Sequence, residues 1–198
     1  MGYIKSAREI ALEKTANEKL STQEIAEIKQ QEKISSILAK YYKNQIEPDE
    51  LWHHFKGIPL KYLIEAQNSF IKSLTFQSND YDFEKRKRGV LAIENLKKSN
   101  QSSNIEYYFE QLTKIQREFQ KNKEQLIDYV KEDLKRNPQK KLQTFQKGNQ
   151  IIIKELSIEE VLEQDRVLKQ KLNQMERQYK EKFNQTKEKL ANIINNQE

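Results

Sequence analysis

Apolar residues recur every three or four positions over most of the chain, which is the spacing of one face of an α-helix. In the first half these faces are broad, as in Leu60, Leu63 and Ile64, which are followed by Ile71 and Leu74. We therefore expect a helical N-terminal bundle over residues 1–99. Its predicted helices cover residues 7–18, 22–43, 48–55, 59–76 and 80–98.

The apolar pattern narrows after the polar run SNQSSN at residues 99–104, which predicts a loop and a domain boundary. Beyond this run, apolar positions form narrow stripes whose steps alternate between three and four residues. This is the coiled-coil-like seam of two helices that pack on each other. We expect a long antiparallel helical hairpin over residues 104–198. Its two helices should cover residues 105–145 and 157–195, and the second should be about 57 Å long at 1.5 Å per residue.

The connection between these two helices is expected to be extended. Pro138 should kink or end the first helix, and Gly148 should end its continuation. Three consecutive isoleucines at 151–153 follow, and β-branched residues are poor on an exposed helix. We expect at most one short extended segment near residues 150–155. It is also the exposed segment most prone to association, because it is apolar and extended, and it is hence a candidate contact for a partner or a second copy. The second helix should then run unbroken, with Asp165 on its seam.

Helix starts are predicted by capping boxes, in which a serine is followed three residues later by glutamate. The hydroxyl and the carboxylate then each accept a hydrogen bond from an unpaired backbone N–H. The chain has four such pairs that open an apolar-periodic segment, and they are Ser6/Glu9, Ser21/Glu24, Ser103/Glu106 and Ser157/Glu160.

Composition supports an all-α chain without one thick core. Only 35% of the 198 residues are hydrophobic and 33% are charged, and the chain has four glycines and three prolines for sharp turns. Cysteine is absent, which excludes disulfides, thiolate nucleophiles, iron–sulfur clusters and Cys-ligated zinc. The N-terminus lacks an apolar stretch of signal-peptide length, and nowhere do 18 apolar residues run together. We therefore expect a cytoplasmic protein without a membrane segment.

The net charge of +6 raises nucleic acid as an alternative partner. The charge is spread evenly, at +3 in each half, and 29 of the 36 basic residues are lysine rather than arginine, which binds phosphate better. A solvated helical surface explains this pattern first. The residues that would contact nucleic acid are Lys85, Arg86, Lys87, Arg88, Lys135, Arg136, Lys140 and Lys141.

Other side chains with chemical potential each have a plainer interpretation. Adjacent His53 and His54 point about 100° apart on a helix, so they do not share one metal. They favour a surface or interface aromatic cluster with Trp52 and Phe55 over acid–base chemistry by one histidine with Asp49 or Glu50. The acidic run Asp80, Asp82 and Glu84 suits a helix start as well as a cation. The pairs Tyr41/Tyr42 and Tyr107/Tyr108 favour core packing over base stacking. The common nucleotide-binding and hydrolase motifs are absent from the sequence, so we expect no cofactor, no metal and no enzyme.

Both ends of the chain resemble a family of small uncharacterised bacterial all-helical proteins. The resemblance rests on KSAREIALEKT at residues 5–15 and on NPQKKLQTFQKG, an isoleucine-rich connector, and LKQKLNQMERQYKEKF near the C-terminus. It implies a helical fold and a bacterial origin, and it supplies no activity and no catalytic residues.

These observations favour a non-enzymatic interaction or scaffold protein that presents an elongated helical-hairpin surface to a protein partner or to a second copy in a homodimer. The residues expected to carry the association are Ile151, Ile152 and Ile153 at the connector, followed by Tyr179 and Phe183, which the seam would leave over. Nucleic-acid binding through lysine-rich helical faces is the alternative.

Overall fold

The computed structural model describes residues 21–98, 100–147 and 150–196, and it is all-α apart from one two-stranded sheet. The predicted fold class is therefore confirmed. The elements in chain order are α2 (Thr22–Tyr42), α3 (Leu51–Phe55), α4 (Leu60–Ser73), α5 (Asp80–Glu94), α6 (Ser102–Arg136), the short 3₁₀-helix η1 (Pro138–Lys141), β1 (Leu142–Lys147), β2 (Gln150–Glu155), α7 (Ile158–Gln164) and α8 (Arg166–Asn195).

The helix predicted over 7–18, its capping box Ser6/Glu9, the motif at 5–15 and Gly148 lie outside the described residues.

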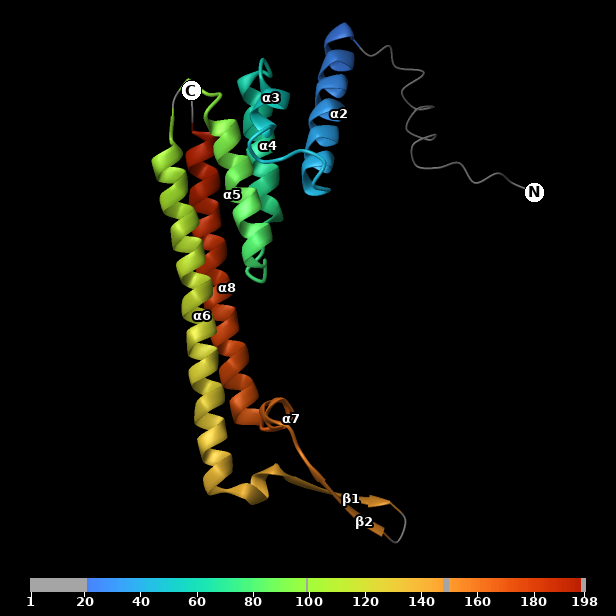
Figure 1. Cartoon of the computed structure of the whole chain (residues 1–198), viewed down its shortest axis with the longest axis vertical. Coiled ribbons are helices and arrows are strands. Elements are labelled where there is room, and N and C mark those ends of the chain that lie inside the picture. The colour runs from blue at the N-terminus through green and yellow to red at the C-terminus, as the bar shows by residue number, and fades with distance from the viewer. Residues whose placement is uncertain (1–20, 99, 148–149, 197–198) are drawn as a thin grey trace, which may run out of the picture.

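Helices α6 and α8 run antiparallel and form a long stalk (Figure 1). Helices α2 to α5 pack at one end of it, and α7 and the β-hairpin lie at the other end. At 1.5 Å per residue, α6 with its 35 residues is about 52 Å long. The molecule is thus a bundle, a stalk and a small hairpin tip.

Two predicted capping boxes start helices. Ser21 caps α2 with Glu24, and Ser157 caps α7 with Glu160, each pair exchanging both hydrogen bonds. The box predicted at Ser103 is wrong, because α6 begins one residue earlier and Ser103 already lies inside its first turn.

The second long helix is broken, contrary to the expectation of one helix over 157–195. The Asp165 carboxylate accepts hydrogen bonds from the backbone N–H groups of Val167 and Leu168, at 2.9 and 3.1 Å. Asp165 is therefore an exposed N-cap that separates α7 from α8, and not a seam residue.

The first long helix is also shorter than predicted. It ends at Arg136, just before Pro138, as proline favours. Residues 142–147 then form strand β1 instead of continuing the helix to 145, while the extended segment expected near 150–155 is β2.

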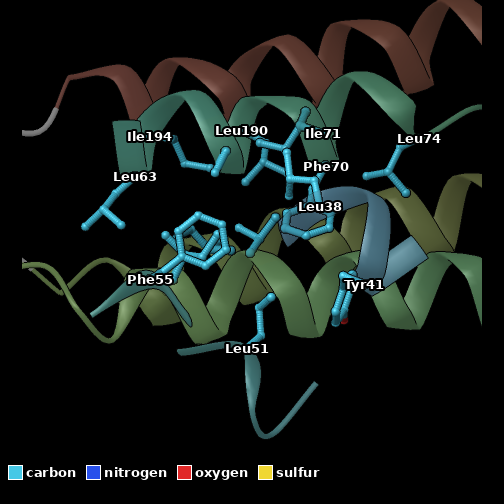
Figure 2. Packing of buried hydrophobic residues seen from close by; sticks show 14 of the residues in the cluster. Leu38, Tyr41, Leu51, Phe55, Leu63, Phe70, Ile71, Leu74, Leu190 and Ile194 are labelled. Atoms are coloured by element: carbon cyan, nitrogen blue, oxygen red, sulfur yellow. The ribbon is translucent and has the colours of Figure 1, made fainter. Parts of the chain in front are cut away.

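One hydrophobic core joins the two halves of the sequence. Fully buried side chains on both sides of residue 99 meet in a single cluster, including Phe70 from α4, Phe109 from α6, and Leu190 and Ile194 from α8. Figure 2 shows Leu38, Phe70 and Leu190, which come from three different helices, pointing into this shared interior. The end of α8 is therefore part of the bundle.

Aromatic rings mark the level at which the bundle meets the stalk. Phe76, in the α4–α5 connection, packs edge-on against Phe119 of α6 and Phe183 of α8, with ring centroids 5.0 and 5.8 Å apart. The Gln116 side-chain amide donates to the Phe76 carbonyl at 2.9 Å, and Lys187 Nζ donates to the Leu74 carbonyl at 3.0 Å. Both long helices are thus tied to the same connection.

A second, smaller cluster lies at the far end of the stalk. Val130 and Leu134 of α6 pack there with Leu156, which follows β2, and with Val161 and Leu162 of α7. This cluster anchors the base of the hairpin with far fewer side chains than the bundle core contains.

Gly89 marks a close approach between α5 and α4. A Cβ atom at this position would lie 2.9 Å from the Phe70 ring, which is fully buried. Gly89→Ala gains up to about 1 kcal/mol of helix propensity, but overpacking a filled core costs about 1–3 kcal/mol. We expect a net loss of unfolding free energy, measured by denaturant titration.

The Phe70→Leu background is the control, because it removes the ring atoms that the new methyl group would meet. The loss caused by Gly89→Ala should shrink or reverse there. An equal loss in both backgrounds would show that the Phe70 contact is not its cause.

Candidate functional site

The β-hairpin exposes large apolar side chains from both of its strands. Strands β1 and β2 pair antiparallel, with Phe145 opposite Ile152 and Thr144 opposite Ile153. Ile151, Ile152 and Ile153 are 72%, 44% and 63% exposed, and Phe145 is 43% exposed. Because successive strand residues point to opposite faces, Ile152 and Phe145 lie on one face, and Ile151 and Ile153 on the other.

Polar contacts hold the base of this hairpin. The Leu156 N–H donates to the Lys141 carbonyl at 2.7 Å, and Lys141 pairs with Glu155 at 3.6 Å. Lys154 of β2 pairs with Glu160 of α7. The strands are therefore oriented by their base, while the three isoleucines contribute little burial within the chain.

Tyr179 lies along the stalk and is half-buried. Its hydroxyl accepts a hydrogen bond from the Asn122 amide at 2.6 Å, and its ring packs on Phe119 at 5.8 Å. Tyr179 therefore joins α8 to α6 and presents part of its ring to the outside.

The structure places Phe183 differently from the expectation that it would be left over by the seam. Its ring is fully buried against Phe76 and belongs to the bundle core. The physical reason is that α8 meets the bundle at this level, so a seam residue becomes a core residue. Phe183 is therefore not part of the accessible surface.

The basic run at 85–88 does not form one face. Lys85 is buried, its Nζ donates to the Asn44 side chain, and burial lowers the pKa of its amine. Arg86 Nε donates to Ser73 Oγ at 2.8 Å, and the guanidinium lies over the Tyr42 ring. Arg88 pairs with Glu84 at 3.7 Å. The expected nucleic-acid contact at Lys85 is corrected, because this side chain packs inside the fold.

The second basic group lies where α6 ends. Lys135 pairs with Glu132 at 2.6 Å and Lys140 with Asp133 at 2.7 Å, while Lys141 pairs with Glu155. The hydrogen bond from Lys140 holds the pKa of the Asp133 carboxyl below its ordinary value. Each of these three lysines therefore has a local carboxylate, which reduces the positive potential available to phosphates.

A shallow depression of about 480 Å³ between α5 and α6 also has mixed charge. Its lining alternates carboxylates with cations, as in Glu110, Lys114, Arg117 and Glu118, with Lys87 at its edge. This pattern is typical of a solvated helical surface.

The remaining chemical candidates are dispersed. His53 and His54 are exposed on α3, and the His53 ring stacks on Trp52 at 3.6 Å. Asp82 pairs with Arg86 at 3.5 Å, and its carboxylate accepts a hydrogen bond at 3.1 Å from the side-chain amide of Asn79, the N-cap of α5. Within residues 21–98, 100–147 and 150–196, His, Asp and Glu side chains form no group of three or more that could hold a metal ion.

One member of each tyrosine pair packs in or against the core. Tyr41 is fully buried, its hydroxyl donates to the Lys85 carbonyl at 2.6 Å, and burial raises its pKa. Tyr42 is partly exposed and its hydroxyl lies 3.2 Å from Ser73 Oγ. Tyr108 packs against the core, whereas Tyr107 is exposed.

A buried polar cluster that was not predicted from the sequence lies between α4, α5 and the start of α6. The side chains of Glu94 and Lys97 are fully buried and pair at 3.2 Å. The Gln67 amide donates to Glu94 at 3.0 Å and to the Val90 carbonyl at 2.9 Å, and the Gln101 N–H donates to Glu94 at 2.9 Å. The available signal was that Glu94 follows Val90 by four residues, on the apolar face of its helix.

The environment of this cluster favours an ionised Glu94. Burial opposes the charge, but the hydrogen bonds from Gln67 and Gln101 and the nearby ammonium of Lys97 outweigh it, so the pKa of the Glu94 carboxyl lies below its ordinary value. Burial also lowers the pKa of the Lys97 amine. The cluster fixes α4, α5 and α6 relative to one another.

Comparison with known proteins gives one family. Residues 52–192, from α3 into the last turn of α8, match the Family of unknown function (DUF6657). The chain belongs to this family. The matched residues include those of the bundle helices α3 to α5, the two stalk helices and the hairpin. No curated protein and no solved structure matched the sequence. None of the described helices combines the length and apolar composition that crossing a membrane requires.

Glu94→Gln tests the buried pair. Removing the carboxylate takes this counter-charge from the buried ammonium of Lys97, and breaking a buried pair in this way typically costs about 3–5 kcal/mol. We expect a large fall in unfolding free energy by urea titration at pH 7. The matched control is Glu132→Gln, in the exposed pair with Lys135, which should leave the midpoint nearly unchanged.

The difference between the wild type and Glu94→Gln should also depend on pH. Because the folded pKa of Glu94 lies below its ordinary value of 4.5, its stabilisation is present above that pH and is lost as the pH falls through the folded pKa. The two unfolding free energies should therefore converge on acidification from pH 5 to pH 3. A constant or growing difference over that range would contradict this account of Glu94.

Proposed function

We propose that this DUF6657 protein is a non-enzymatic scaffold whose hairpin tip is its protein-contact element. The observation that carries the proposal is the exposure of Ile151, Ile152 and Ile153 on a hairpin held away from the bundle by the α6–α8 stalk. Contiguous exposed apolar side chains on a strand are typical of interaction sites, because leaving them in water costs free energy that a partner recovers.

The stalk supports this proposal through its shape. Its far end buries only the small cluster around Leu134 and Leu162, while the main core lies at the bundle end. A partner at the tip would therefore contact the hairpin without disturbing the bundle. The half-buried Tyr179, on the stalk, is a secondary contact candidate within the same elongated surface.

Nucleic-acid binding through the basic residues ranks second. Lys87 and Arg136 remain candidates, but Lys85 is buried, and Arg88, Lys135, Lys140 and Lys141 each pair with a carboxylate. A phosphate backbone would compete with a carboxylate at each of these paired residues. We therefore favour a protein partner. Bacterial origin, cytoplasmic location and coiled-coil pairing of the stalk helices belong to the same proposal.

Site-specific photo-crosslinking tests the proposal. We would introduce benzoylphenylalanine in place of Ile151 at the tip and, as a matched control, in place of Tyr107, which is 54% exposed at the bundle end. Irradiation of cells that make each variant should give discrete protein adducts from position 151 and few from position 107. The measurement is the number and mass of adduct bands after denaturing electrophoresis.

Adducts from both positions alike, or from position 107 alone, would overturn the assignment of the contact surface to the tip. The adduct mass separates two kinds of partner, since a second copy adds 23.7 kDa to the chain and another protein adds a different mass.

A further inference from the structure

We propose that the partner at the tip is a second copy of this chain, and that the two copies join by antiparallel pairing of their β2 strands into a four-stranded sheet. This inference rests on the proposed function, because it uses the same hairpin. It goes further by assigning the partner, the edge and the register.

The hydrogen-bond pattern of the hairpin identifies the free edge. The Leu156 N–H donates to the Lys141 carbonyl, and the register pairs Leu142 with Glu155 one step further along the ladder. In an antiparallel ladder, bonded and non-bonded residue pairs alternate. Lys141/Leu156 is a bonded pair, and every second pair from it is also bonded, which makes Phe145/Ile152 bonded. The N–H and C=O groups of Ile151 and Ile153, in the pairs between, therefore point away from β1.

These outward groups limit how two β2 strands can pair. A bonded pair across the two-fold axis must join outward residues, so the axis passes at Ile151, Ile152 or Ile153. With the axis at Ile152, each Ile151 exchanges main-chain hydrogen bonds with Ile153 of the second copy, and Ile152 faces Ile152.

With the axis at Ile153, Ile151 would face the charged Glu155. With the axis at Ile151, Ile153 would have no isoleucine opposite. Only the register centred on Ile152 sets all three isoleucines opposite isoleucines, which is the isologous contact that a closed two-fold dimer requires.

Charge and stability favour the same arrangement. In this register Lys154 lies opposite Gln150, whereas parallel in-register pairing would set Lys154 against Lys154. An isolated two-stranded hairpin is marginal in water, and every residue of β2 is exposed in the single chain. Pairing through β2 adds strands and covers apolar surface.

The other edge of the hairpin closes the assembly at two copies. The outward residues of β1 are Leu142, Thr144 and Gln146, which lack the run of β-branched apolar residues that β2 has. Edges with fewer apolar residues pair less readily. The structure therefore assigns a dimer and not an open-ended fibre.

The absence of cysteine allows a direct test of the register. We would prepare Ile152→Cys, with Ile151→Cys as the matched control, and oxidise each purified full-length protein. Opposed residues in a non-bonded antiparallel pair lie about 4.5 Å apart at Cα, which is within disulfide reach. Two copies of residue 151 are offset along the strands in this register and lie beyond that reach.

The expected result is a disulfide-linked dimer from Ile152→Cys in several-fold excess over Ile151→Cys, although residue 151 is the more exposed of the two. Equal linkage in both variants, or more from Ile151→Cys, would overturn the register. Unchanged helical circular dichroism would show that the bundle and stalk are intact in each variant.

Sedimentation equilibrium tests the dimer itself without any new thiol. The wild type should show a reversible equilibrium between 23.7 kDa and twice that mass at micromolar concentration. The double variant Ile151→Lys/Ile153→Lys sets like charges opposite each other and should raise the dissociation constant at least about tenfold. A strictly monomeric wild type, or a dimer that the double variant leaves unchanged, would overturn the inference. If the wild type is monomeric while position 151 crosslinks to a different protein in cells, the self-pairing inference fails and the proposed function stands.

Discussion

The insertion of the C-terminal part of α8 into the bundle is the contact on which the rest of the structure depends. Leu190 and Ile194 are fully buried among side chains from the N-terminal half, and Phe183 completes the aromatic contact with Phe76. Without this helix the bundle would expose a large part of its core. Helix α8 reaches that position by packing antiparallel along α6, and this pairing forms the stalk.

This constraint explains how a chain with so few apolar residues stays ordered. Burial is concentrated at one end, where the buried pair of Glu94 and Lys97 fixes the helices around the core. Further along the stalk, narrow stripes of apolar residues are enough to pair α6 with α8. The small cluster around Leu134 anchors the base of the hairpin. The isoleucines of β2 are among the large apolar side chains that the fold leaves exposed, and in the proposal they serve association and not folding.

Part of the local chemistry was predictable from the sequence, and placement in three dimensions was not. Capping at Ser21 and Ser157 follows from short-range hydrogen bonding, and an interruption of the helix at Pro138 follows from backbone geometry, although the predicted helix continued to residue 145. Strand β1 was missed because its pairing depends on β2, and the two strands define each other. Asp165 fits the seam by spacing, yet its carboxylate satisfies backbone N–H groups and breaks the helix. The burial of Phe183 and Lys85 depends on which part of each helix meets the bundle, and periodicity carries no information about that.

The main core, closed by α8, stabilises one end of the stalk, while the tip opens independently. Native-state hydrogen exchange along α6 tests this most directly, at a protein concentration low enough for a single chain. We expect amides near Phe109 and Leu112 to exchange only through global unfolding. Amides near Val130 and Leu134, and those in β2, should exchange through openings of lower free energy. Equal protection along the whole of α6, lost only with global unfolding, would contradict this expectation.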